Sequence, residues 1–83
     1  MIERTVTIAS SFETRSAALL VQTASKFTSK VHIKVDDRTA NAKSIMGIIS
    51  LGLTDGQVVQ LIADGDDERQ VMPALEQFFL VSH

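Results

Sequence analysis

Lys43-Ser-Ile-Met-Gly-Ile-Ile-Ser-Leu51 places a serine directly before a short run of large apolar residues. Serine is a preferred N-cap residue, because its hydroxyl oxygen accepts a hydrogen bond from a backbone N–H of the first turn. The pattern therefore predicts a short apolar helix that begins after Ser44. So short a helix cannot bury all its large side chains against one sheet. We expect part of the following set to remain exposed as a docking patch: Ile45, Met46 and Ile49.

Ser44 also admits another interpretation, as a site of phosphorylation. A phosphate on its hydroxyl would lie at a helix N-terminus, where backbone N–H groups and the helix dipole favour an anion. The modification would add about −1.5 to −2 charges beside the apolar patch. From the residues alone, the capping role and the modification site both stay open.

Alternating apolar residues on both sides of this segment predict strands. The alternation covers Ile2–Ile8, Val31–Val35 and the region around Val59–Ala63. After a turn at Asp36-Asp37, the segment Thr39–Ala42 can return as a further short strand. The residues expected to face inward are Val6, Ile8, Val31, Ile33, Val35, Val59, Leu61 and Ala63.

Two further segments show helical spacing. From about Thr14 to Phe27 one face carries Ala17, Leu20, Val21, Ala24 and Phe27. A last helix should follow the acidic run Asp64–Glu68, whose carboxylates are favourable at a first turn. Because Pro73 removes a hydrogen bond beyond that turn, we expect a kink or a late helix start. The expected inner stripe of this helix is Val71, Ala74, Leu75 and Phe78.

The order β-α-β-β-α-β-α predicts an α+β fold, with one mostly antiparallel sheet and the helices on one face. The 83 residues allow a single domain over 1–83. A formal charge of −2 disfavours direct binding to nucleic acid. Because no apolar run approaches 18 residues, we expect a cytoplasmic protein that does not cross a membrane.

Catalytic and metal-binding signatures are sparse. The chain has no cysteine, and neither a P-loop nor a dinucleotide fingerprint is present. His32 and His83 fit a solvated surface better than a general base or a ligand. The spacing of the acids at Asp64–Glu68 is not that of a calcium loop. We therefore expect neither an enzyme nor a cofactor or metal site.

With these positions laid out, the chain resembles the HPr family of bacterial phosphotransferase-system phosphocarriers. Two stretches carry the resemblance, Leu20-Val-Gln-Thr-Ala-Ser-Lys-Phe27 and Lys43-Ser-Ile-Met-Gly-Ile-Ile-Ser-Leu-Gly-Leu53. The stretch that begins at Lys43 is similar to the regulatory-serine motif of Gram-positive members. The resemblance implies an open-faced β-sandwich, in which three helices cover one side of a four-stranded antiparallel sheet.

One departure from the family pattern changes the expected function. HPr proteins carry a Gly-Ile-His-Ala-Arg-Pro-Ala motif whose histidine accepts phosphate from Enzyme I. The corresponding run here is Ser11-Phe-Glu-Thr-Arg-Ser-Ala17, so that Glu13 replaces the histidine while Arg15 and Ala17 are kept. A phosphohistidine cannot form at this position, which predicts the loss of phosphocarrier activity.

An intact Ser44 motif without the histidine is similar to the HPr-like paralogues called Crh, or catabolite repression HPr. The similarity implies that HPr kinase/phosphorylase phosphorylates Ser44, and that the product binds a transcription regulator of the catabolite control protein A type. It also implies a set of partner contacts, namely Arg15, Lys43, Ile45, Met46 and Ile49.

Three alternatives stay open. Glu13 could carry phosphate as an acyl phosphate, which would make the chain a phosphotransferase component. The chain could instead be a degenerate paralogue with another protein partner. As a further hypothesis, the charge of Glu13 could mimic a phosphorylated histidine beside Arg15, and partner affinity should then change in a Glu13→Gln variant.

The face of the sheet that the helices leave open gives the last expectation. Val58 and Ile62 should point onto it, away from the helices. Scattered apolar surface residues are common, and this interpretation is favoured. The other interpretation is a homodimer that associates through that face or through a sheet edge.

Overall fold

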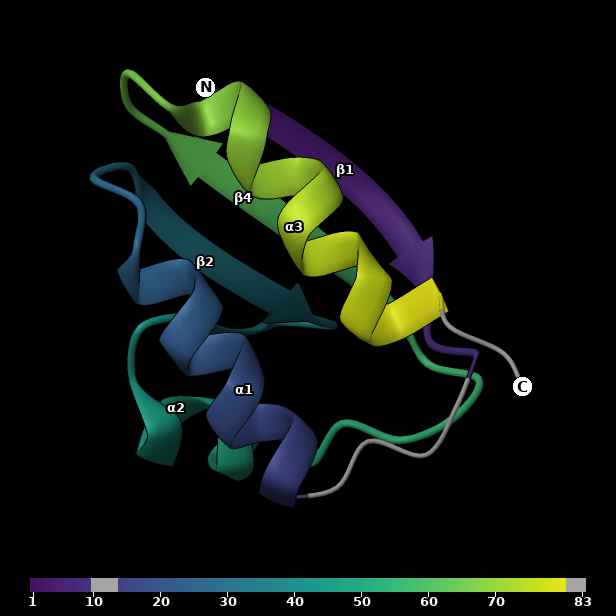
Figure 1. Cartoon of the computed structure of the whole chain (residues 1–83). Coiled ribbons are helices and arrows are strands. Elements are labelled where there is room, and N and C mark those ends of the chain that lie inside the picture. The colour runs from purple at the N-terminus through teal and green to yellow at the C-terminus, as the bar shows by residue number, and fades with distance from the viewer. Residues whose placement is uncertain (10–13, 81–83) are drawn as a thin grey trace.

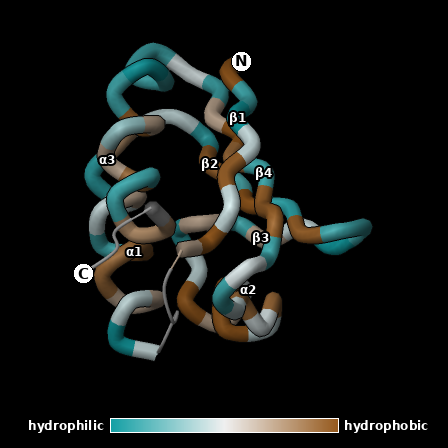
Figure 2. Tube along the Cα trace, turned by 90° about the vertical axis from the view of Figure 1, so that its right-hand side faces the viewer, coloured by the Kyte–Doolittle hydropathy of each residue, from teal (hydrophilic) through white to brown (hydrophobic). Residues whose placement is uncertain are grey.

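The computed structural model describes residues 1–9 and 14–80 of the chain, and the helices and strands follow the predicted order. Figure 1 shows these elements along the chain, and the label of β3 is in Figure 2. Their bounds are β1 (Ile2–Thr7), α1 (Thr14–Ser25), β2 (Lys30–Val35), β3 (Arg38–Asn41), α2 (Ile45–Leu51), β4 (Val58–Asp64) and α3 (Glu68–Leu80).

The four strands form one antiparallel sheet in the order β1-β4-β2-β3. On the central strand β4, Leu61 pairs with Arg4 of β1 and with Ile33 of β2. Helices α1 and α3 cover one face of the sheet (Figure 1), and the turned view of Figure 2 shows them on one side of the strands. The predicted α+β, open-faced sandwich is therefore confirmed.

The core lies between the sheet and the helices. All eight predicted inward strand residues are buried, with exposed fractions of at most 7%. Ala17, Leu20 and Ala24 of α1 are buried as predicted, while Val21 and Phe27 are half-buried. Burial of alternate strand residues against one helical stripe is the arrangement expected of a two-layer fold.

The predicted inner stripe of α3 is wrong at two positions. Val71 and Leu75 are fully buried as expected, but Ala74 and Phe78 are only half-buried. The structure buries Met72 and Phe79 instead. Helix α3 packs against α1 as well as against β1 and β4. Its buried face is therefore turned toward Met72 and Phe79, compared with the face that the sheet alone would bury.

Helix α3 does not begin late, contrary to one of the two expectations for Pro73. It starts at Glu68 and continues through Pro73. Because proline has no N–H, the carbonyl of Arg69, four residues earlier, lacks its helical hydrogen bond. Both Arg69 and Pro73 are exposed. Water can therefore solvate that carbonyl, which makes the proline tolerable inside the helix.

The acidic run before α3 does not act as a simple set of capping groups. Glu68 does serve the helix start, because its carboxylate accepts a hydrogen bond of 3.1 Å from the N–H of Gly65. The carboxylate of Asp67 instead accepts hydrogen bonds from Thr28 and Ser29, in the connection between α1 and β2.

None of the helices in the described part of the chain has both the length and the apolar character that a membrane span requires.

Candidate functional site

Ser44 is the N-cap of α2, as predicted. Its backbone is extended (φ −112°, ψ 113°), and its Oγ accepts a hydrogen bond of 3.2 Å from the N–H of Gly47. The Ser44 carbonyl accepts the first helical bond, 3.1 Å long, from the N–H of Ile48. The residue is half-buried, and its hydroxyl lies at the start of the helix.

The turn that leads to Ser44 is tied down by four hydrogen bonds. Asn41 accepts two of them, from the N–H of Lys43 at its Oδ1 (2.8 Å) and from the N–H of Ser44 at its carbonyl (3.0 Å). The buried Ala42 donates its N–H to Val31 of β2 at 2.9 Å. The fourth bond joins the Lys43 ammonium to the Phe27 carbonyl at 2.8 Å. The hydroxyl of Ser44 thus sits on a fixed backbone.

Gly47 leaves room beside the serine hydroxyl. A Cβ added at this position would lie 3.4 Å from Ser44 Oγ and 3.4 Å from the Cβ of Ala40. The absence of a side chain at Gly47 therefore keeps one side of the hydroxyl open, at the expense of the lower helix propensity of glycine.

The apolar residues of α2 divide between the core and the surface. Ile48 and Leu51 are buried, and Ile45 is half-buried against the core. Met46 and Ile49 are exposed, by 69% and 45%. The expectation that part of this set stays at the surface is met by these two residues.

Leu19 of α1 is exposed to the same degree as Ile49, although it was not among the residues predicted for a partner surface. The signal was available, because Leu19 lies opposite the buried stripe formed by Ala17, Leu20 and Ala24 on the same helix. Since α1 contacts α2, the helical side of the molecule presents exposed apolar side chains on two neighbouring helices.

Arg15 and the Lys43 contact lie at opposite ends of α1. Arg15 is exposed near the start of the helix. The ammonium of Lys43, the neighbour of Ser44, bonds to the Phe27 carbonyl just past the helix end. Glu13 falls outside the described residues.

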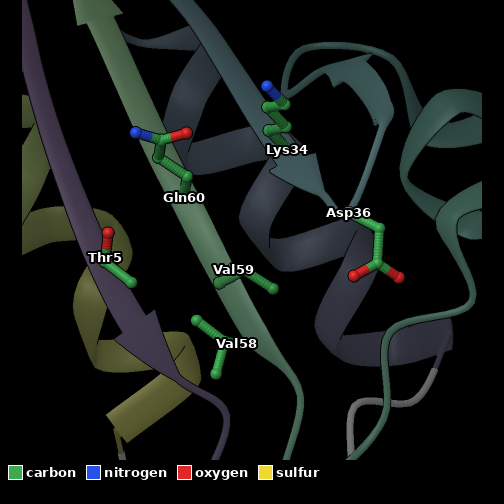
Figure 3. Close-up of a pocket in the computed structure, with 6 residues that line it drawn as sticks. All are labelled: Thr5, Lys34, Asp36, Val58, Val59 and Gln60. Carbon is green, nitrogen blue, oxygen red and sulfur yellow. The ribbon is translucent and has the colours of Figure 1, made fainter.

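The open face of the sheet holds a shallow depression of about 350 Å³. Figure 3 shows Val58 and Gln60 of β4 between Thr5 on one side and Lys34 and Asp36 on the other. Val58 is 57% exposed and Ile62 half-buried, and both point away from the helices as predicted. His32, half-buried, pairs with Ile62 of β4 and with Asn41 of β3, and its side chain lies on this face too.

Within the part of the chain that the structure describes, no group of three or more histidine or acidic side chains could hold a metal ion.

Comparison with known proteins links this geometry to one family. The family model described as "PTS HPr component phosphorylation site" matches residues 2–80. The HPr-like protein Crh of Halalkalibacterium halodurans is 42% identical over 80 residues, which cover 94% of this chain and 95% of that protein.

Two solved structures show the same fold. The HPr structure from Thermoanaerobacter tengcongensis is 46% identical and matches with a TM-score of 0.89 over 100% of both chains. The Crh structure of Bacillus subtilis is 40% identical, with a TM-score of 0.76 over 95% of this chain and 93% of that one. Identity alone does not separate the two groups, since both HPr and Crh proteins exceed 40%. The resemblance seen in the sequence is confirmed, and the chain belongs to the HPr family of phosphotransferase-system proteins.

Proposed function

We propose that this protein is a regulatory member of the HPr family without phosphocarrier activity. In this proposal HPr kinase/phosphorylase phosphorylates Ser44, and the phosphorylated protein binds a transcription regulator of the catabolite control protein A type. The protein would thereby serve carbon catabolite regulation as a co-effector and not as an enzyme.

One combination carries the proposal: the Ser44 segment is complete, while Glu13 stands where the family has its phosphate-accepting histidine. His32 offers no substitute, because it lies on the open face of the sheet, away from α1 and α2. Two observations on Ser44 support the proposal. The residue is only half-buried, and its backbone is held by the preceding turn.

The proposed binding mechanism uses charge and apolar contact together. A phosphate on Ser44 would offer strong acceptor oxygens to basic groups of the partner, and charge-assisted hydrogen bonds of this kind are the strong ones. Met46 and Ile49, exposed on the same helix, would supply the apolar contact. Arg15 would meet the partner at a separate point, near the start of α1.

The test is intact-mass spectrometry after incubation with ATP and HPr kinase. We expect one added phosphate in the wild type and in Ser50→Ala, whose serine is exposed on the same helix, and none in Ser44→Ala. A parallel reaction with Enzyme I and phosphoenolpyruvate should add nothing. Phosphate gained only from Enzyme I would instead support a carrier that uses Glu13.

A homodimer is a further part of the proposal. The Bacillus subtilis Crh structure is described as an intertwined dimer with a swapping domain. Light scattering across a concentration series would reveal a dimer of this chain. Such a dimer could form through the open face of the sheet or by exchange of a segment between two chains. A Val58→Lys variant separates these two modes, because it should abolish association through the open face and leave an exchanged dimer intact.

A further inference from the structure

Lys43 is half-buried, and its ammonium has an uncharged partner. The ammonium donates a hydrogen bond of 2.8 Å to the carbonyl of Phe27. None of the ion pairs found within residues 1–9 and 14–80 includes Lys43. A lysine that held its charge ready for a partner would be expected to extend into water. The side chain of Lys43 instead runs along the protein to the end of α1.

The end of α1 is a favourable place for this ammonium. The chain tightens there, because Lys26 and Phe27 donate their N–H groups to the carbonyls of Thr23 and Ala24, each at 3.2 Å. The last carbonyls of a helix lack helical partners and carry the negative end of its dipole. The Phe27 carbonyl lies just beyond them, so a cation bonded to it lies near the negative end of the helix dipole.

This contact restrains the residue directly before Ser44. The backbone N–H of Lys43 is held by Asn41, and its side chain is held by Phe27. Both bonds fix the entry of the chain into α2, where Ser44 Oγ meets the N–H of Gly47. Releasing the side chain would leave the turn to be held by Ala42 and Asn41 alone.

We propose that Lys43 is a positioning residue for Ser44, which fixes the serine hydroxyl by tying the β3–α2 turn to the end of α1, and that it is not a contact for the partner. The proposal rests on the proposed phosphorylation of Ser44. It replaces the partner-binding role expected for Lys43 from the family resemblance with a role inside the molecule.

Three variants test the proposal. Lys43→Met keeps the length of the side chain and removes the ammonium, while Lys43→Arg keeps a donor. Lys26→Met is the matched control, because Lys26 is an exposed lysine near the same helix end. For each protein we would measure kcat and KM of phosphorylation by HPr kinase, together with the hydrogen exchange of the Gly47 amide in the free protein.

We expect Lys43→Met to lower kcat/KM by about tenfold, since a misplaced reacting group slows a reaction strongly. The Gly47 amide should exchange faster in the same variant, Lys43→Arg should restore most of both properties, and Lys26→Met should match the wild type. Unchanged exchange with a salt-dependent rise in KM would overturn the proposal and make Lys43 a partner contact. If the wild type is not phosphorylated, the proposed function fails, and the exchange of Gly47 still decides the role of Lys43.

Discussion

Asp67, between β4 and α3, accepts hydrogen bonds from both the backbone N–H (3.0 Å) and the hydroxyl of Ser29, which lies 38 residues earlier in the chain. The N–H of Thr28 donates a third bond of 2.9 Å to the same carboxylate. Ser29 is almost completely buried, although it is polar. One carboxylate therefore joins the connection after α1 to the connection before α3 and satisfies the buried serine.

These bonds make the stability of the protein sensitive to acid. The hydrogen bond from the Ser29 hydroxyl, followed by that from the Thr28 N–H, lowers the pKa of Asp67 from 3.8 to about 2. A depressed folded-state pKa contributes stability that is fully present above the unfolded value and is lost as the pH falls through the folded one. We expect an Asp67→Asn variant to lose less of its stability than the wild type between about pH 4 and pH 2.

The measurement is the urea midpoint as a function of pH. Asp66→Asn is the matched control, because Asp66 is the exposed neighbouring carboxylate and the substitution is the same. Identical acid limbs for wild type and Asp67→Asn would contradict the assignment.

Gly65 lets the two connections approach each other. Its φ is +155°, and a Cβ added there would lie 2.6 Å from the Oγ and 2.7 Å from the Cα of Ser29. We expect Gly65→Ala to destabilise the fold by about 2 kcal/mol or more, through backbone strain and the clash together. Gly52 also has a positive φ, +62°, but nothing lies within 4 Å of its added Cβ. Gly52→Ala should therefore cost only about 1 kcal/mol in a denaturation experiment, and a reversed order would refute this account.

Local sequence patterns could predict the elements but not the contacts between their connections. Strand alternation identified every fully buried strand residue, and the serine before an apolar run identified the N-cap, because both signals depend on neighbours in the chain. Asp67 bonds to a serine 38 residues away, and Lys43 to a carbonyl 16 residues away. No periodicity in the sequence indicates such partners. The sequence therefore predicts a helix-start role for Asp67 and, through the family resemblance, a partner contact for Lys43.

The error in α3 has a similar origin. Helical spacing defines a stripe only to within one position, and several apolar residues of α3 compete for the inner face. Packing against α1 favours Met72 and Phe79 over Ala74 and Phe78. Which of these two pairs is buried depends on the position of α1, and the local sequence pattern of α3 does not predict that position.

The N-cap of α2 predicts a stability change that must be separated from phosphorylation. Ser44→Ala removes the acceptor for the Gly47 N–H and should lower the free energy of unfolding by about 1 kcal/mol. Ser44→Asp keeps a capping oxygen and should stay within about 0.5 kcal/mol of the wild type. Chemical denaturation of the two variants checks this, and equal losses would mean that the cap contributes little.

The exposed apolar residues of α2 predict where the regulator binds. Met46→Ala and Ile49→Ala should each weaken the affinity of the Ser44-phosphorylated protein for the regulator by about tenfold, as expected of residues at the centre of an interface. Their stability should change little, because both side chains are exposed. Val58→Ala, on the open face of the sheet, is the control for calorimetric titration. If Val58→Ala lost affinity while the two α2 variants bound normally, the interface would lie on the open face of the sheet.

Replacing Gly47 should affect the rate of phosphorylation more than the free energy of unfolding. Alanine favours a helix over glycine by about 1 kcal/mol, and the added methyl would meet Ala40 and Ser44 Oγ at 3.4 Å, which is tight but not a clash. The two effects oppose each other, so Gly47→Ala should unfold within about 1 kcal/mol of the wild type. The same methyl lies against the oxygen that must receive the phosphate.

We therefore expect Gly47→Ala to be phosphorylated by HPr kinase about tenfold more slowly while it remains folded. Ser50→Ala, which changes an exposed residue on the same helix, should keep the wild-type rate. Circular dichroism and the kinetics are measured on the same samples, so that a misfolded variant is recognised. A folded Gly47→Ala protein with the wild-type rate would show that the space beside Ser44 Oγ is not the one through which phosphate arrives.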